Sequence, residues 1–403
     1  MPQPAPSSSP RAPGPIGEIA ATFLTLGLTS FGGPIAHLGY FRNECVVRRK
    51  WITESDYASL VALCQLLPGP TSSQVAFGLG WRRAGLGGAL AASAGFILPS
   101  ALLMLGFAAG AERLGLLDHV GWVAGIKVAA VAVVAHATLG MARSLCRTRA
   151  AAAIALASAA AVLLLSLALS QPLCLVVGGV IGFWACRAAG PSETLTPAVE
   201  HAPRLATALA CLALWALLLG STFVPWGQAD GGPAALFGRF FRAGSLVIGG
   251  GHVVLPLLRG ELVPAGWLSD RTFLAGYGVA QLMPGPLFSV AAYYGSVARA
   301  AGPCGGAVAL FGLYLPGWLA LVGALPFWSA LRVRPGLSGV FAGMSAAAVG
   351  LLGAALYRPL WAESIHGVAG AGLAGAAFAC LCLTRLPTWL VVGLCTLAGA
   401  WMA

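Results

Sequence analysis

The stretch Gln65-Leu66-Leu67-Pro68-Gly69-Pro70 returns 216 residues later as Gln281-Leu282-Met283-Pro284-Gly285-Pro286. A chain rich in Leu and Ala matches itself by chance at those residue types. Chance does not place a glutamine and a Pro-Gly-Pro in the same register. The recurrence therefore indicates two copies of one structural unit.

The match extends well beyond these hexapeptides. A shift of 217 residues places Phe23, Gly27, Gly32, Gly33 and Glu44 on Phe240, Gly244, Gly249, Gly250 and Glu261. A shift of 216 places Trp51 and Glu54 on Trp267 and Asp270, and 217 again places Gly85, Gly88 and Pro99 on Gly302, Gly305 and Pro316. We expect a disordered tail over 1–15, a first repeat over 16–189, a linker with one unpaired helix over 190–230 and a second repeat over 231–403.

The composition excludes a soluble enzyme and a disordered chain. Of the 403 residues, 58% are hydrophobic and 9% are charged, with a mean hydropathy of +0.85. Soluble domains carry about a quarter charged residues, and disordered chains are poor in apolar residues. The net charge of +11 comes from short cationic clusters between apolar stretches. This pattern is typical of loops at an anionic membrane face, and we expect no binding to nucleic acid.

Thirteen apolar stretches approach the roughly 20 residues that a helix needs to cross a bilayer. They lie near 16–38, 57–80, 86–110, 120–141, 150–170, 172–187, 205–224, 234–257, 272–298, 304–328, 337–356, 366–384 and 386–402. Continuous apolar stretches of this length in lipid are helices, because backbone groups there need partners within the segment. The sequence predicts an all-α polytopic membrane protein with about 13 transmembrane segments.

The number of stretches predicts how the repeats are related. Six crossings return the chain to its starting side, and the unpaired seventh stretch, 205–224, then delivers the second repeat upside down. Inverted repeats are typical of secondary transporters, whose substrate site lies near the midplane between the repeats. The positive-inside rule favours a cytoplasmic N-terminus.

Each repeat contains two helix breaks in matching positions. They are Phe31-Gly32-Gly33-Pro34, Pro68-Gly69-Pro70-Thr71, Ile248-Gly249-Gly250-Gly251 and Pro284-Gly285-Pro286. A break exposes a helix N-terminus, whose N–H groups and dipole favour an anion. Proline and glycine also occur at simple kinks and close contacts in membrane helices. The occurrence of two breaks at matching positions in each repeat favours a binding site over simple kinks or close contacts.

We expect the breaks and the polar residues around them to bind the substrate. These candidates are Gly32, Gly33, Gln65, Pro68, Gly69, Thr71, Ser72, Gly249, Gly250, Gln281, Pro284, Gly285 and Ser289. Glutamine, threonine and serine supply donors without full charge, so the anion can be released again. Hydrogen bonds that hold helices together explain the same residue types equally well.

A second group of charged and titratable residues suits a vestibule or ion coupling. These candidates are Arg42, Glu44, Lys50, Arg82, Arg83, Lys127, His37, His252, Arg259, Glu261 and Arg299. Cations at the mouth of a site raise the local anion concentration. Lys127 stands out because it lies within an apolar stretch, where an ionisable residue is costly. Interfacial anchoring for the arginines and structural hydrogen bonding for the histidines are the competing interpretations.

No catalytic residues, metal site or cofactor are expected. The ten cysteines and six histidines are scattered, without a Cys-x-x-Cys pair. No Gly-x-x-x-x-Gly-Lys nucleotide loop and no His-Glu-x-x-His motif occurs in the chain. The chain is therefore not expected to be an enzyme, and transport by this chain would be driven by a gradient or by exchange.

The spaced motifs resemble the chromate ion transporter family over about 16–400. Those that carry the resemblance are Phe31-Gly32-Gly33-Pro34, Arg48-Arg49-Lys50-Trp51-Ile52-Thr53-Glu54, Gln65 to Pro70 and Gly85-Leu86-Gly87-Gly88, followed by Gly249-Gly250-Gly251-His252, Trp267-Leu268, Gln281 to Pro286 and Pro316. The resemblance implies a bacterial inner-membrane protein that exports chromate, gives chromate resistance and exchanges with a sulfate-like anion or uses a gradient. Chromate, a sulfate-like oxyanion, the lipid bilayer and a second copy of the chain are the candidate partners.

Two alternatives remain beside that resemblance. A transporter or channel for sulfate or another oxyanion would use the same breaks, and a membrane sensor or scaffold could use the same fold without transport. The second repeat also departs from the first: Gly251 stands where Pro34 stands, and no Arg-Arg-Lys cluster precedes Trp267. The repeats are therefore expected to contribute unequally.

Overall fold

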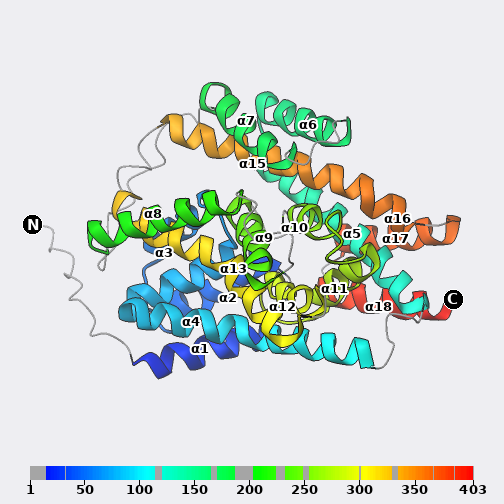
Figure 1. The fold of residues 1–403 in the computed structure, drawn as a ribbon, viewed down its shortest axis with the longest axis horizontal. Coiled ribbons are helices and arrows are strands. Elements are labelled where there is room, and N and C mark those ends of the chain that lie inside the picture. Colours follow the sequence, from blue (N-terminus) through cyan, green and yellow to red (C-terminus); the bar gives the residue numbers. More distant parts are fainter. Residues whose placement is uncertain are drawn as a thin grey trace, which may run out of the picture.

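The computed structural model describes residues 15–31, 33–113, 120–164, 170–186, 203–223, 232–247, 254–298, 301–328, 335–365, 367–384 and 386–402. These residues form helices joined by short connections, and no strand occurs among them (Figure 1). Within this part of the chain, four apolar helical stretches are long enough to cross a membrane: Thr71–Gly110, Ala124–Arg143, Gly302–Phe327 and Gly339–Arg358. The protein is an all-α polytopic membrane protein, as the sequence predicts.

The helices follow the repeat closely. Up to the unpaired helix they are α1 (Ile16–Thr29), α2 (Gly33–Phe41), the π-helix η1 (Arg42–Arg48), α3 (Glu54–Leu66), α4 (Thr71–Arg113), α5 (Val120–Leu145), α6 (Arg149–Leu164), α7 (Ser170–Ala185) and α8 (Leu205–Ser221). The remainder are α9 (Pro233–Leu246), α10 (Val254–Leu262), α11 (Asp270–Leu282), η4 (Leu287–Ser289), α12 (Val290–Val297), α13 (Gly302–Ala324), η6 (Leu325–Phe327), α15 (Pro335–Ala355), η7 (Leu356–Trp361), α16 (Ala362–Ser364), α17 (Gly367–Leu383) and α18 (Thr388–Met402).

Helix α1 and the α2–η1 segment form a helical hairpin. Glu18 near the start of α1 pairs with Arg49 just after η1, with 2.9 Å between Oε1 and Nη1. Farther along, the rings of Phe23 and Phe41 lie 5.6 Å apart in an edge-to-face arrangement. A continuous helix would separate Glu18 from Arg49 by more than 40 Å at about 1.5 Å per residue. The chain therefore enters and leaves this hairpin at the same end.

A second hairpin consists of α3 and the first arm of α4. Asp56 in the first turn of α3 pairs with Arg82 at the far end of that arm, at 3.2 Å, and Gly78 packs against Leu60. The tip of the hairpin is Pro68-Gly69-Pro70. The chain then reverses at Gly85, whose φ of +57° suits glycine. The second arm of α4 runs back along the first.

The second repeat builds the same pair of hairpins. Glu261 at the end of α10 pairs with Arg242 of α9, with 2.6 Å between Oε1 and Nε. In the other hairpin, the Tyr294 hydroxyl of α12 donates to the Phe273 carbonyl of α11 at 2.7 Å. The reversal before α13 uses Gly302, the repeat counterpart of Gly85, with a φ of +63°.

These hairpins refine the predicted crossings. The stretches 16–38, 57–80, 234–257 and 272–298 each fold back on themselves rather than cross the membrane once. The reason is that each contains one of the proline or glycine breaks. At the two Pro-Gly-Pro breaks, which the structure describes, the chain turns instead of kinking. Removing two crossings from six leaves an even number, so the predicted inversion of the second repeat is unaffected.

The path of α4 shows that the two pairs of hairpins enter from opposite ends of the molecule. At its start the second arm of α4 packs at Gly88 against the base of the first repeat's hairpin. Ser100 then lies beside Gly285 at a tip of the second repeat. Beyond it, the Phe107 ring lies 5.2 Å from that of Tyr293, partway toward the base of the second repeat. The second arm of α4 thus connects the two bases.

Helix α13 takes the equivalent path in reverse. Near its start, Gly305 packs against Gly295 at the base of the second repeat, and Gly317 then reaches Gly69 at a tip of the first repeat. Just after α13, the Trp328 indole donates to the Ser59 hydroxyl of α3 at 2.8 Å. The two repeats are therefore inverted relative to each other, with their hairpin tips facing.

The outer helices are exchanged between the repeats. Helix α5 of the first repeat packs against α17 and α18 of the second, and α15 packs against α6 and α7 (Figure 1). Close glycine contacts at equivalent positions mark both packings: Gly125 with Cys395, and Gly178 with Gly343. The unpaired helix α8 packs on α13 and α9. This exchange holds the two inverted repeats together around the facing tips.

Candidate functional site

Two reciprocal backbone hydrogen bonds join the tips of opposite hairpins. The Gly69 N–H donates to the Val247 carbonyl at 2.8 Å, and the Gly285 N–H donates to the Ser30 carbonyl, also at 2.8 Å. The donors are equivalent under the repeat, and so are the acceptors. Both Pro-Gly-Pro breaks and the residues that precede the other two breaks, Ser30 and Val247, therefore converge at one place, which we call the tip junction.

Glycine is required at both donor positions of the tip junction. Gly69 has a φ of +120° and Gly285 a φ of +88°, values that other residues rarely adopt. A Cβ on Gly69 would lie 2.6 Å from the Gly317 Cα, and one on Gly285 would lie 2.9 Å from the Ser100 Oγ. The backbones thus approach as closely as they can.

Gln74 supplies the most deeply buried amide at the tip junction. It lies in the first turn of α4 and is fully buried. Its Nε2 donates to the carbonyl oxygens of Pro68, at 2.9 Å, and Gly317, at 3.0 Å. Its Oε1 has no hydrogen-bond partner among the described residues. The side chain therefore links the tip of one repeat to α13 of the other through its Nε2, while its Oε1 remains able to accept a hydrogen bond.

Several hydroxyl groups gather on the other side of the tip junction. The Oγ atoms of Ser100 and Ser289 lie 2.7 Å apart, and Tyr314 lies beside Ser73 and Ser289. Within the described part of the chain, the hydroxyls of Ser30, Ser73 and Tyr314 are buried without a hydrogen-bond partner. Because buried polar groups in proteins are almost always hydrogen-bonded, these groups indicate a place for a polar ligand or water.

The chemistry of the tip junction suits an anion that is bound and released. Helices α2 and α4 and the η4–α12 segment all begin at the tips, and the first N–H groups of a helix have no partner within it. The hydroxyl and amide side chains named above are neutral donors. Donors of this kind stabilise an oxyanion without neutralising it.

The sequence comparisons agree with this geometry. A family model described as chromate transporter matches residues 17–183 and 234–400, two segments whose first and last residues are each 217 positions apart. This chain belongs to the chromate transporter family. The matched segments contain all four breaks.

Relatives named as chromate transport proteins align over most of their length. The chain is 28% identical to those of Pseudomonas aeruginosa and Cupriavidus metallidurans, covering 79% and 80% of those proteins and 84% and 83% of itself. It is 27% identical to a probable chromate transport protein of Synechococcus elongatus, covering 89% of that protein and 95% of itself. No solved structure matches the chain.

Most of the residues that the sequence predicts to bind the substrate lie at the hairpin tips. Those described there are Gly33, Pro68, Gly69, Thr71, Ser72, Pro284, Gly285 and Ser289. Thr71, Ser72 and Ser289 are buried, whereas Gly32, Gly249 and Gly250 lie outside the described residues.

The two expected glutamines differ from each other. Gln65 is exposed, whereas Gln281 is half-buried beside Tyr277. The Gln281 Nε2 has no hydrogen-bond partner among the described residues. Of this repeat-related pair, Gln281 is thus the one placed to offer a buried donor.

The expected vestibule cations lie in ion pairs at the hairpin bases, away from the tips. The pairs are Arg42 with Glu54, Arg82 with Asp56, Arg83 with Glu18, Arg259 with Asp270, Glu44 with Arg48 and Arg49, and Glu261 with Arg239 and Arg242. Burial raises the pKa of Glu44, but the hydrogen bonds from Arg49 and Arg48 outweigh burial, so that the net pKa lies below its ordinary value. These pairs tie helices of one base together.

The other expected coupling residues have varied surroundings. Lys50 is exposed with a φ of +53°, and Lys127 is half-buried within α5. His37 is fully buried near the first tip, with its ring 5.3 Å from that of Phe96. His252 and Arg299 lie outside the described residues.

Reasoning from the sequence did not find Gln74, Ser100 or Tyr314. The signal for Ser100 was available, since Pro99 and Pro316 match between the repeats and the next residues, Ser100 and Gly317, reach the tips. Gln74 and Tyr314 have apolar counterparts in the other repeat, so a search for matching residues passes over them.

Proposed function

We propose that this chain transports chromate, or a similar tetrahedral oxyanion, through the tip junction. The observation that carries the proposal is the reciprocal pair of bonds from Gly69 to Val247 and from Gly285 to Ser30. They bring helix ends from both inverted repeats to one place lined by neutral donors. The names of the relatives, chromate transport proteins, support chromate as the substrate.

The arrangement of the hairpins suggests how access could alternate. Each pair of hairpins separates the tip junction from one end of the molecule, because the two pairs enter from opposite ends. Displacing the tips of one repeat would open the junction toward that repeat's end and leave the other end closed. Inverted repeats in secondary transporters work by such rocking around a fixed site.

The finer features of the function belong to the same proposal. We place the protein in the bacterial inner membrane and infer export, because removal of chromate from the cell would give resistance. The absence of a nucleotide-binding loop in the sequence favours a driving gradient or exchange with a sulfate-like anion. The neutral lining agrees with exchange, since it releases one dianion as readily as it takes another.

The direct test is flux of radiolabelled chromate into proteoliposomes that contain the purified protein. We expect saturable uptake, inhibition by sulfate and acceleration by sulfate loaded inside the vesicles. Protein-free vesicles and vesicles with a folded Gly69→Ala protein are the controls. No flux with chromate or sulfate would contradict the proposal, and flux that does not saturate would indicate a channel.

A further inference from the structure

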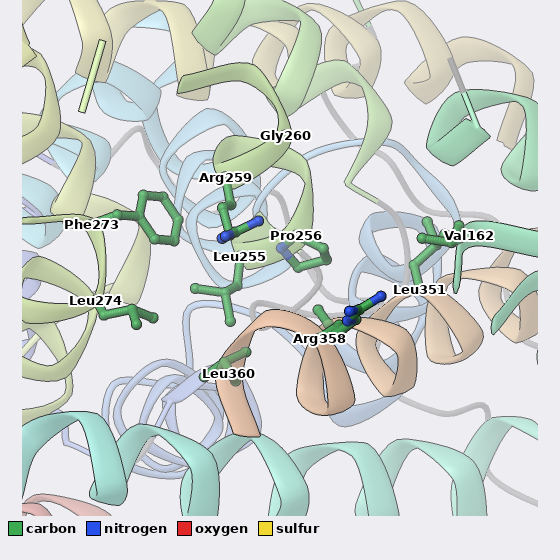
Figure 2. A pocket seen from close by; sticks show the side chains of 11 residues that line it. Val162, Leu255, Pro256, Arg259, Gly260, Phe273, Leu274, Leu351, Arg358 and Leu360 are labelled. Carbon is green, nitrogen blue, oxygen red and sulfur yellow. The ribbon is translucent and has the colours of Figure 1, made fainter. Parts of the chain in front are cut away.

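A separate cavity lies at the base of the second repeat, away from the tip junction. It has a volume of about 150 Å³ and lies between α10, α11, α15 and η7 (Figure 2). Its apolar wall includes Leu255, Phe273, Leu351 and Leu360. The cavity lies outside the proposed transport path, so the tip junction does not explain why two arginines line it.

Two arginines face this cavity. Arg259 and Arg358 both line it, and Figure 2 shows their guanidinium groups along the same cavity. Asp270 accepts from Arg259, at 2.7 Å from Nε and 2.6 Å from Nη2. Both charged side chains that line the cavity are thus cationic, and the carboxylate that pairs with Arg259, Asp270, is not among the lining residues. A guanidinium group has five N–H donors, and the Arg358 guanidinium lines the same cavity, where an oxyanion could accept from it.

The surroundings of the cavity are those of a membrane interface. Arg358 interrupts η7 with extended backbone angles, φ −132° and ψ 117°. Its neighbours Tyr357 and Trp361 are 63% and 45% exposed. Aromatic residues with exposed rings gather at the level of lipid headgroups. Val162, which also lines the cavity, is followed by Leu163 and Leu164, both exposed. An apolar surface therefore continues outward from a cationic cavity.

We propose that this cavity binds the phosphate of an anionic phospholipid headgroup. Arg259 and Arg358 hold the phosphate, and the acyl chains lie along the exposed apolar surface beside Val162. A guanidinium group matches the geometry of phosphate oxygens well. The same oxyanion chemistry would also attract free phosphate, but a free ion does not use the adjoining apolar surface.

The repeat makes this site one-sided. Arg42 and Glu54 occupy the positions of Arg259 and Asp270 in the first repeat. The position of Arg358 is occupied by Gly140 at the offset of 218 that relates Gly125 to Gly343, or by Met141 at an offset of 217, and neither residue is charged. The second cation is therefore present at only one of the two bases. A lipid bound here would contact one end of the inverted pair and bias its hairpins relative to the other end.

Native mass spectrometry of the detergent-purified full chain tests the site without any flux measurement. Phosphatidylglycerol, phosphatidylcholine and inorganic phosphate are added separately. We expect retention of phosphatidylglycerol over phosphatidylcholine, and about fivefold weaker retention in Arg358→Gln, which is the contribution of one basic residue near an anionic membrane surface. Arg143→Gln removes an exposed arginine from α5 and should change nothing.

Val162→Trp gives a second variant, which fills the cavity and keeps its charge. It should also weaken retention of phosphatidylglycerol. Unchanged retention in Arg358→Gln, equal retention of the two lipids, or inorganic phosphate bound as tightly as phosphatidylglycerol would each overturn the proposal. None of these outcomes depends on whether the protein transports chromate.

Discussion

The two hydrogen bonds of the tip junction have the same backbone geometry, but the side chains around them differ. At one, Gly69 faces Gly317, and the amide of Gln74 bridges the two repeats. At the other, Gly285 faces Ser100, whose hydroxyl contacts Ser289. Duplication thus preserved the geometry that brings the tips together, while the side chains around them diverged. The two sides of the proposed site are unequal.

The hairpin bases show the same division between constant and changed features. Arg42 with Glu54 and Arg259 with Asp270 are equivalent ion pairs, with closest N–O distances of 2.6 Å in both repeats. In contrast, the partners of Glu44 follow it in the chain, whereas Glu261 is held by arginines of α9. The hairpin architecture tolerates such exchanges because either arrangement neutralises the half-buried carboxylate.

The largest effect should come from alanine at the tip glycines. Gly69→Ala forces a positive φ on a residue with a Cβ and drives that Cβ into the Gly317 backbone, which cannot yield. Strain of this kind and overpacking each cost about 1 kcal/mol or more. We expect chromate flux to fall by more than about tenfold. Gly285→Ala should be milder, because its Cβ would lie 2.9 Å from the movable hydroxyl of Ser100 and 3.1 Å from the nearest backbone atom, the Gly27 carbonyl oxygen.

The control for these two variants is Gly106→Ala on the second arm of α4. Nothing lies within 4 Å of a Cβ at Gly106, and the residue is exposed. Its flux and its thermal unfolding temperature should match those of the unmodified protein. If Gly285→Ala proved more damaging than Gly69→Ala, the backbone contact with Gly317 would not be the feature that limits the tip junction.

A smaller effect is expected from the glutamines. Gln74→Leu leaves the carbonyl groups of Pro68 and Gly317 without their donor, at a cost of about 1–3 kcal/mol. We expect the KM for chromate to rise by roughly tenfold, because a cost in this range weakens affinity by about that factor. Gln65→Leu is the matched control, since Gln65 is exposed. A larger rise in KM for Gln65→Leu would move the site away from α4.

Much of this architecture follows from the sequence. The matching Pro-Gly-Pro motifs predict two repeats, and the parity of the apolar stretches predicts their inversion, because both depend on patterns that persist over many residues. The re-entrant hairpins were not predicted. A break at Pro68-Gly69-Pro70 permits either a kink or a full reversal, and only tertiary contacts such as Asp56 with Arg82 select the reversal.

The site itself could be predicted only where its residues match between the repeats. The glycines of the tips were found for that reason. Gln74 and Tyr314 act from positions whose counterparts are Val290 and Ile97, so no internal comparison marks them. Arg42 and Arg259 matched but lie at the bases, because a repeated residue can serve the scaffold as well as the site.

The serine pair at the tip junction sharpens the comparison of its two sides. The Oγ atoms of Ser100 and Ser289 share one buried hydrogen bond. A double-mutant cycle of Ser100→Ala and Ser289→Ala, read by thermal unfolding in detergent, should give a coupling of about 0.5–1.5 kcal/mol. Additive effects would mean that each hydroxyl bonds elsewhere, and Gln74 would then be the side-chain link between the repeats on one side without a counterpart in the serine pair on the other.

The smallest effect concerns the Glu44 ion pairs at the base of the first repeat. Because the arginines hold the pKa of Glu44 below its ordinary value of 4.5, the ionised carboxylate stabilises the fold. That stabilisation is fully present above the ordinary value and is lost as the pH falls through the lower folded value. Glu44→Gln should therefore lower stability at neutral pH by at most about 1 kcal/mol.

The difference between Glu44→Gln and the unmodified protein should then shrink on acidification. Thermal unfolding between about pH 7 and about pH 3 measures it, since linkage relates the slope to the protons taken up. If the difference in stability between the two proteins stayed constant over this range, the glutamine variant would have lost contacts that do not depend on the charge of Glu44. The pairing of Glu44 with Arg48 and Arg49 would then be a consequence of the hairpin rather than a cause of its stability. The different arginine partners of Glu261 in the second repeat would likewise not have changed the free energy of unfolding.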